Sequence, residues 1–157
     1  MTDTGPLARL ADLGLELPPA PRPAATYVPA IRAGQTLYVS GQIASGPSGG
    51  LTVTGRLGAE LDVEAGQACA RTCALNVLAQ IQEALGDLAQ VEQVLKLHIY
   101  VAATPDFDSH HLVANGASDV LQAVLGDAGV GARSAFGVSN LPMNSPVEVD
   151  AIVLVAA

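Results

Sequence analysis

The sequence predicts an α+β domain in which two long helices cover one face of a mixed β-sheet. The 157 residues suit one domain, 1–157, with a hydrophobic core of its own. Stretches that alternate apolar and polar residues, as strands do, are interrupted by two long stretches with the apolar spacing of helices. Their order is strand, strand, helix, strand, helix, strand, strand, which is typical of a two-layer fold with its helices on one side.

Residues 1–24 are expected to form a short helix and an extended arm. The helix is predicted around 7–13, and the four prolines between Pro18 and Pro23 then favour extended chain. The start has no apolar signal region, and no stretch approaches the roughly 18 apolar residues that a membrane span needs. We therefore expect a cytoplasmic protein without a membrane partner.

The first long strand is expected at 35–43, followed by a glycine-rich loop. The side chains expected on one face of this strand are Leu37, Val39, Gly41 and Ile43. A short strand is expected at 51–54. Asp62 is typical of a helix N-cap, and the helical spacing that follows it ends at Gly86.

The second half of the chain predicts three strands and one helix. A strand is expected at 91–101, and the side chains expected on one of its faces are Leu95, Leu97, Ile99 and Val101. A turn at 104–106 is expected to start a helix that ends near Leu125. Strands at 133–138 and 147–155 complete the sheet.

Charge limits the classes of partner. Seven Lys and Arg residues stand against fifteen Asp and Glu residues, which gives a formal net charge of −8. Nucleic acids and anionic membranes both need a basic surface, so neither is expected as the partner, and ribonuclease activity is disfavoured. The negative net charge still allows a small anionic ligand that is bound by a single cationic side chain.

The cysteines and histidines do not form a metal-binding pattern. Cys69 and Cys73 lie four residues apart in the first long helix, where they are expected to be small buried apolar residues rather than a disulfide. His98, His110 and His111 lack metal-ligand spacing, and no nucleotide, phosphate or zinc motif accompanies them. We expect neither a metal nor an organic cofactor.

Arg133 is the main candidate for ligand binding. It is the only Lys or Arg after Lys96, and it begins an apolar stretch that is expected to be a strand. An arginine in such a place either reaches solvent or meets an anion. Two interpretations stay open: Arg133 pairs with an Asp or Glu of the chain, or its guanidinium binds a ligand carboxylate.

Glu148 is the second candidate, because it lies among valines in the last strand. Alternation predicts that Glu148 and Asp150 share one face, opposite to the valines. Glu148 is then either a solvated carboxylate, or a partner of Arg133, or a partly buried carboxylate that orients and activates a water.

Four short segments carry a resemblance to a known family. They are Ser40-Gly41-Gln42, Gly131-Ala132-Arg133-Ser134, Leu141-Pro142 and Val147-Glu148-Val149-Asp150-Ala151-Ile152. In order and spacing they resemble the reactive-intermediate deaminase (RidA/YjgF) family, formerly labelled endoribonuclease L-PSP. The resemblance covers roughly residues 25–155. It indicates a divergent branch, because Gly131 replaces the usual proline and Ala135 the usual cysteine.

The resemblance implies a fold, an assembly and a reaction. The fold is chorismate-mutase-like, and the assembly is a homotrimer whose sheets form a central barrel with small-molecule clefts between subunits. The reaction is hydrolytic deamination of reactive 2-imino acids and enamines, of the 2-aminoacrylate type, to 2-oxo acids and ammonia without a cofactor. The alternative is a non-catalytic trimer that binds small carboxylates in the same cleft.

The resemblance also implies roles for individual residues. Arg133 would bind the substrate carboxylate, Glu148 would hold the attacking water, and Tyr27 would line the cleft, so these three are the expected catalytic residues. The expected substrate-binding residues are Gly41, Ala135 and Asn115. His111 is an alternative to Asn115 as a residue that lines the cleft.

Overall fold

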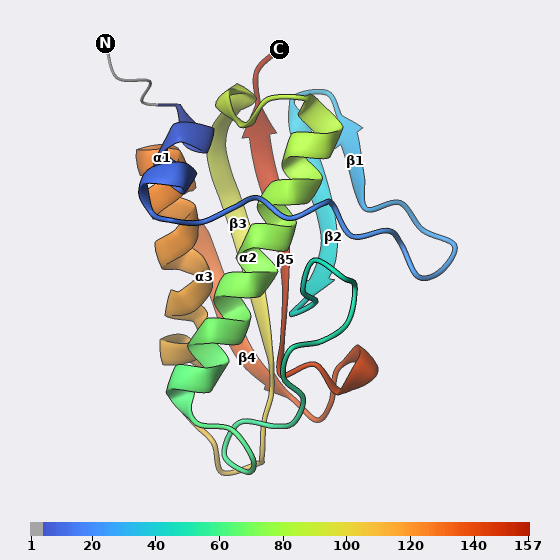
Figure 1. Ribbon diagram of the computed structural model, residues 1–157, viewed down its shortest axis with the longest axis vertical. Helices are drawn as coiled ribbons and strands as arrows, with labels where there is room; N and C mark the ends of the chain where they lie inside the picture. Colours follow the sequence, from blue (N-terminus) through green and yellow to red (C-terminus); the bar gives the residue numbers. More distant parts are fainter. Residues whose placement is uncertain (1–4) are drawn as a thin grey trace.

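The two long helices, α2 (Val63–Leu85) and α3 (His110–Leu125), lie side by side on one face of a five-stranded mixed sheet (Figure 1). The structure is a computed structural model that describes residues 5–157. It confirms the α+β class predicted from the sequence. The other elements are α1 (Pro6–Asp12), β1 (Ala30–Ala33), β2 (Thr36–Ile43), β3 (Val91–Ala102), β4 (Ala132–Val138), β5 (Val147–Val155) and the short 3-10 helices η1 (Leu88–Gln90), η2 (Gly126–Gly129) and η3 (Pro142–Asn144).

The sheet has the strand order β1-β2-β5-β3-β4. Strands β3 and β4 run parallel and are joined through α3, whereas the other neighbouring pairs are antiparallel. A parallel pair needs a long crossover, because the chain must return to the end of the sheet at which the first strand began. The carboxyl ends of β3 and β4 therefore meet at one end of the sheet.

Helix α2 begins and ends where the sequence predicts. The Asp62 side chain accepts a hydrogen bond from the Ala65 N–H at 2.9 Å, and Gly86 ends the helix with a φ of 79° that suits glycine. Cys69 and Cys73 are free, buried thiols, and burial raises the pKa of both. Their expected role as small buried apolar residues is confirmed.

The hydrophobic core lies between the helices and the sheet and is aliphatic. Its largest fully buried side chains include Leu10, Leu37, Leu57, Leu78, Ile81, Leu88, Leu97, Ile99 and Leu121. Among the helices of residues 5–157, none is both long and apolar enough to cross a membrane.

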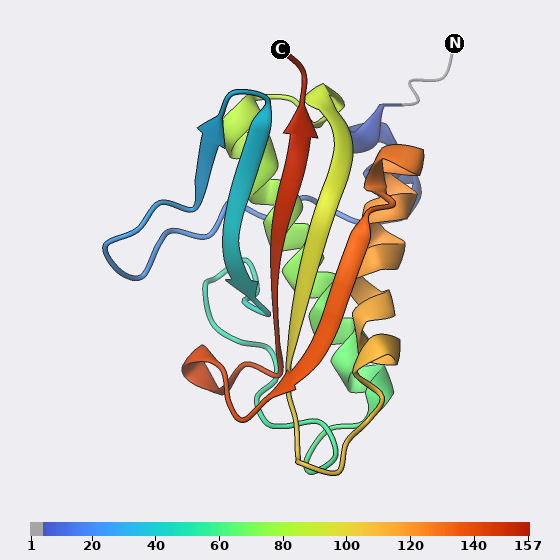
Figure 2. The ribbon, with the colours of Figure 1, turned by 180° about the vertical axis from the view of Figure 1, so that it is seen from behind.

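Within residues 5–157, no helix covers the other face of the sheet, which we call the open face (Figure 2). Cross-strand neighbours form rows on it. One row holds Ile31, Tyr38 and Ile152, and another holds Ile43, Glu148, Tyr100 and Phe136. Ile31, Tyr38 and Phe136 are 60%, 46% and 41% exposed, so the open face presents apolar side chains to solvent in a single chain.

A bulge in β2 corrects the expected face of Gly41 and Ile43. The register with β5 shifts between Val39 and Gln42, so Gln42 is buried while Ile43 pairs with Glu148. An extra residue reverses the alternation of the strand beyond it. Gly41 and Ile43 therefore do not share the buried face with the first half of the strand.

Three further expectations differ from the structure. The register of β3 shifts between Val94 and Lys96, which leaves Leu95 41% exposed and off the face of the buried Leu97. Residues 51–54 form one isolated bridge instead of a strand, and the additional strand is β1. The second long helix begins at His110, several residues after the expected turn, because the chain between them continues as a loop.

Residues 13–29 form the extended arm that the prolines predict, and the arm crosses the outer side of α2 (Figure 1). The buried Gln80 side chain of α2 donates to the Pro21 carbonyl at 2.6 Å. The Ser40 hydroxyl of β2 donates to the Val28 carbonyl at 2.7 Å. These two bonds fix the middle and the end of the arm against the domain.

Candidate functional site

Arg133 lies in β4, at the edge of the sheet, and its side chain points to α3. Nη1 donates to Asn115 Oδ1 at 2.9 Å and to Ser118 Oγ at 3.0 Å, and Nη2 donates to the His111 carbonyl at 3.0 Å. All three acceptors are neutral. No Asp or Glu of residues 5–157 forms an ion pair with the guanidinium, so the interpretation in which Arg133 pairs with an acid is wrong for the described part of the chain.

The guanidinium of Arg133 keeps donors for a ligand. An arginine has five N–H groups, and three of them are used by α3. The Nε–H and one Nη2–H have no acceptor within residues 5–157. A cavity of about 190 Å³ adjoins the side chain, and its other lining residues are Leu97, Ser118, Gln122, Gly129, Val130 and Gly131. Arg133 is therefore a rigidly held cation whose charge is not neutralised within the described chain.

Glu148 lies on the open face of β5 and is partly buried. Burial raises the pKa of its carboxyl group, and the negative charge of Asp150 raises it further. Gly41 of β2 lies directly against this carboxylate, since a Cβ at Gly41 would overlap Glu148 Oε1. A carboxylate with a raised pKa is a stronger base than an exposed one, which is the property a water-activating group needs.

A hydrogen-bonded network lies beside Glu148, and the sequence did not identify it as part of a site. Asp150 Oδ2 accepts a hydrogen bond from the Tyr100 hydroxyl at 2.7 Å, and Asp150 Oδ1 lies 2.7 Å from His98 Nδ1. Burial and the contact with Asp150 raise the pKa of Tyr100 to about 12. Alternation places His98 and Tyr100 on one face of β3, and Glu148 and Asp150 on one face of β5. This spacing of two residues could have been read from the sequence.

Tyr27 and Gly41 line a larger cavity of about 530 Å³ between the arm and the loop after β2. Its walls also include residues of the arm from Pro19 to Ala24. Tyr27 is 48% exposed, and its hydroxyl accepts a weak hydrogen bond from the Ala24 N–H at 3.4 Å. Glu148 touches Gly41, so three of the expected site residues, Tyr27, Gly41 and Glu148, lie at or next to this cavity.

The structure does not bring Arg133 and Glu148 together within one chain. Arg133 is in register with Leu97, which is buried beneath the helices, whereas Glu148 is in register with Tyr100 on the open face. Strand β3 also separates β4 from β5. Since neighbouring strands are about 4.8 Å apart, a small ligand cannot touch two side chains on opposite faces and two strands apart.

The remaining expected residues lie on the helix side. Asn115 contacts Arg133 and fixes its orientation. The Ala135 side chain packs against the hydrophobic core, so its expected contribution through the backbone stays a prediction. Within residues 5–157, no three or more His, Cys, Asp or Glu side chains are grouped so that they could hold a metal ion.

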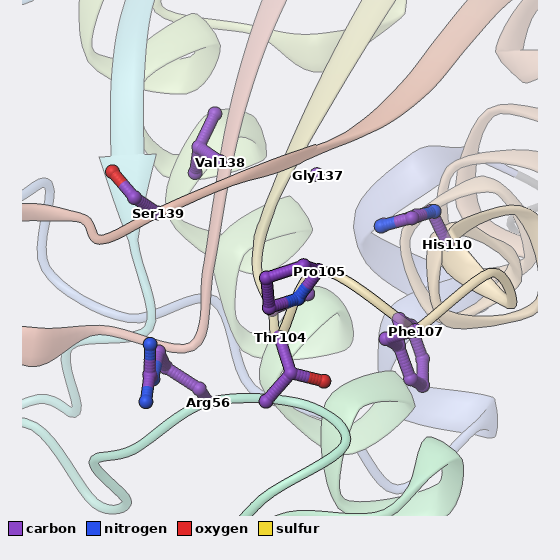
Figure 3. Close-up of a pocket in the computed structure, with 9 residues that line it drawn as sticks. Arg56, Thr104, Pro105, Phe107, His110, Gly137, Val138 and Ser139 are labelled. Atoms are coloured by element: carbon purple, nitrogen blue, oxygen red, sulfur yellow. The ribbon is translucent and has the colours of Figure 1, made fainter.

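His110 lines a third cavity, of about 420 Å³, at the carboxyl ends of β3 and β4 (Figure 3). Its ring stands edge-on to Phe107, with centroids 5.2 Å apart, and lies against Gly137. Arg56 lines the same cavity from the loop before α2. None of the residues expected to form the site lines this cavity.

The chain belongs to the RidA/YjgF family, because the family model described as endoribonuclease L-PSP matches residues 18–155. Protein TCP17 of Trypanosoma cruzi is 49% identical over 147 residues, which are 93% of this chain and 91% of that protein. A 2-iminobutanoate/2-iminopropanoate deaminase of Dermatophagoides farinae is 30% identical over 141 residues, which are 90% of this chain and 94% of that protein.

Solved structures agree with this assignment. The crystal structure of Atu1372, a protein of unknown function from Agrobacterium tumefaciens, is 46% identical with a TM-score of 0.89, covering 97% of this chain and 94% of that one. The YjgF gene product of E. coli is 26% identical with a TM-score of 0.61, covering 88% of this chain and 93% of that one. The family and fold expected from the sequence resemblance are confirmed.

Proposed function

We propose that the protein hydrolyses small 2-imino acids and the related enamines to 2-oxo acids and ammonia. The observation that carries the proposal is Arg133, a fixed guanidinium that forms no ion pair with an acid of residues 5–157 and keeps two N–H donors. A 2-imino acid carries a carboxylate next to its reactive carbon, and a guanidinium binds a carboxylate through two hydrogen bonds. The name of the Dermatophagoides farinae relative supports the same class of reaction.

Glu148 supplies the base in this proposal. The carbon of a protonated imine is electrophilic, so the water needs only to be positioned and to lose one proton. As the water oxygen bonds to the carbon, the Glu148 carboxylate takes that proton and then passes it to the nitrogen. The C–N bond breaks and ammonia leaves. As the C=O bond forms, the oxygen gives its second proton to the Glu148 carboxylate, and ammonia takes up that proton as ammonium. The raised pKa of Glu148 suits this role.

The proposed site is completed by a second copy of the chain. Arg133 and Glu148 face opposite sides of one sheet, so we propose that Arg133 of one subunit faces Tyr27, Gly41 and Glu148 of the next in a homotrimer. The apolar side chains of the open face support burial between subunits. Three equivalent clefts would result.

An assay with 2-iminobutanoate, formed in the cuvette by an amino-acid oxidase, tests the reaction. Arg133→Ala is expected to lower kcat/KM by about a hundredfold or more, because two charge-assisted hydrogen bonds are lost. Arg71→Ala, which removes an exposed arginine of α2, serves as the control and is expected to change nothing. Equal activity of wild type and Arg133→Ala would rule the proposal out.

Binding of small carboxylates without turnover is the second candidate. This candidate is favoured because Arg133 is held in position by α3 of its own chain, whereas Glu148 of that chain lies on the opposite face of the sheet. Calorimetry with 2-oxobutanoate separates the two candidates: binding that survives Glu148→Ala, in a protein without turnover, would select the second. We place either activity in the cytoplasm, where the free thiols of Cys69 and Cys73 would stay reduced.

A further inference from the structure

The cavity beside Tyr27 and Gly41 is larger than a three- or four-carbon imino acid requires. Its volume is about 530 Å³, within the range of roughly 300–1,000 Å³ that holds drug-sized ligands. The Glu148 carboxylate lies against Gly41, which lines this space, so the proposed reacting centre adjoins the cavity at Gly41. The remainder of the cavity extends along the arm and is available to a substrate side chain.

The arm that walls this cavity is held in place, so the residues on it have defined positions. Gln80, which is 3% exposed, donates to the Pro21 carbonyl at 2.6 Å and to Gln42 Oε1 at 3.4 Å. Arg22 follows Pro21 directly and is itself followed by Pro23. Because proline fixes φ near −65° and restricts the residue before it, the backbone at Arg22 has few other conformations.

Arg22 is the cation among the residues that line this cavity. It lines the space together with Tyr27 and Gly41. No Asp or Glu of residues 5–157 forms an ion pair with it. Arg22 is exposed, and it is the only charged residue among those that line this cavity, whose other lining residues are prolines, glycines and neutral side chains. Such a side chain selects an anionic group that enters the cavity.

We propose that this cavity contains a subsite for a second carboxylate, held by Arg22, and that the preferred substrates are 2-imino acids with an acidic side chain. The proposal rests on the proposed imino-acid hydrolysis. The α-carboxylate binds Arg133 of the neighbouring subunit, and the side-chain carboxylate binds Arg22. Arg22 is thus a specificity-determining residue, separate from the residues that carry out the reaction.

Substrate comparison tests the proposal. A five-carbon dicarboxylic imino acid, 2-iminopentanedioate, and the neutral 2-iminobutanoate are each formed in the cuvette by oxidation of the parent amino acid. Wild type is expected to have the higher kcat/KM for the dicarboxylic substrate. Arg22→Ala is expected to lower that value by about ten- to a hundredfold, the loss of one charge-assisted contact, and to leave the neutral substrate within about twofold.

Two variants serve as controls. Arg71→Ala removes an exposed arginine outside the cavity and is expected to preserve the preference. Arg22→Lys keeps the charge and is expected to restore part of the preference. If Arg22→Ala lowered both substrates equally, Arg22 would be a structural residue of the arm and the proposal would be wrong. A wild type without preference for the acidic substrate would also overturn it.

Calorimetry keeps this proposal separate from the proposed reaction. If no imino acid is hydrolysed, the proposed function fails, and binding of 2-oxopentanedioate and 2-oxobutanoate is compared instead. Tighter binding of the dicarboxylate, weakened about tenfold or more by Arg22→Ala alone, would support the subsite without the reaction. Equal binding of both ligands would overturn it.

Discussion

Gly41 determines where the Glu148 carboxylate lies. A Cβ at this position would overlap Glu148 Oε1, which is the far end of a flexible side chain. In Gly41→Ala we therefore expect Glu148 to turn away at a cost of less than about 1 kcal/mol of stability. We expect kcat/KM to fall at least tenfold, because general-base catalysis contributes about 10²–10⁴-fold.

Thermal melts and imine-hydrolysis kinetics of the same protein samples measure both effects. Gly50→Ala is the matched control, since a Cβ there meets no atom within 4 Å and its backbone has no positive φ. Full activity of Gly41→Ala would contradict the placement of Glu148 at the reacting centre.

Asp150 raises the pKa of Glu148, and this predicts a pH effect. Burial and the Asp150 charge both favour the protonated form of Glu148, so the acid limb of kcat/KM lies above the ordinary glutamate pKa of about 4.3. Asp150→Asn is expected to move this limb to lower pH. Asp12→Asn, an exposed substitution on α1, is expected to leave the limb unchanged.

The same pKa shift predicts how stability depends on pH. A carboxyl group with a raised pKa in the folded state stabilises the fold below its unfolded pKa and loses this contribution as pH rises through the folded pKa. Compared with Glu148→Gln, wild type should lose stability as pH rises from about 4.3. Urea unfolding at a series of pH values measures the difference, and parallel curves for the two proteins would contradict the shift.

At the scale of elements, α3 packs against α2 through Gly116. A Cβ at Gly116 would overlap the backbone carbonyl of Gln67, and backbone cannot move aside as a flexible side chain does. Gly116→Ala is therefore expected to destabilise the protein by about 1–3 kcal/mol, which exceeds the roughly 1 kcal/mol gain in helix propensity. Thermal unfolding measures the loss, with Ala123→Ser on the exposed side of α3 as the control.

The sequence predicts the bounds of the last strand better than it predicts which side chains of a strand share one face. The last strand is expected at 147–155 and is observed there, because its valines alternate without interruption and the bulges in its two ladders lie on the partner strands β2 and β3. Gly41 is expected to share a face with Val39, and Leu95 with Leu97, but bulges turn both away from those faces. A bulge depends on how two strands pair, which the alternation within one strand does not reveal.

At the scale of the whole molecule, the open face predicts an oligomer. Ile31, Tyr38 and Phe136 are exposed on it, and the proposed site needs residues from two copies. Phe136→Asp is expected to convert the proposed trimer to monomers and to abolish activity together with assembly, because a charge would be buried in the proposed interface. Light scattering measures the mass, and Leu7→Asp on α1 is the control. A wild-type mass near that of one chain would contradict the trimer.

The sequence by itself determined the α+β class, the two long helices and the family, because periodic patterns and the spacing of short motifs are properties of the chain alone. It also singled out Arg133 and Glu148. Only the tertiary structure showed that Arg133 forms no ion pair with an acid of the described chain and that Arg133 and Glu148 face opposite sides of the sheet. It also showed that Asp150 is hydrogen-bonded with Tyr100 and His98 beside Glu148. These facts depend on strand order and register, which bring together residues that are far apart in the sequence.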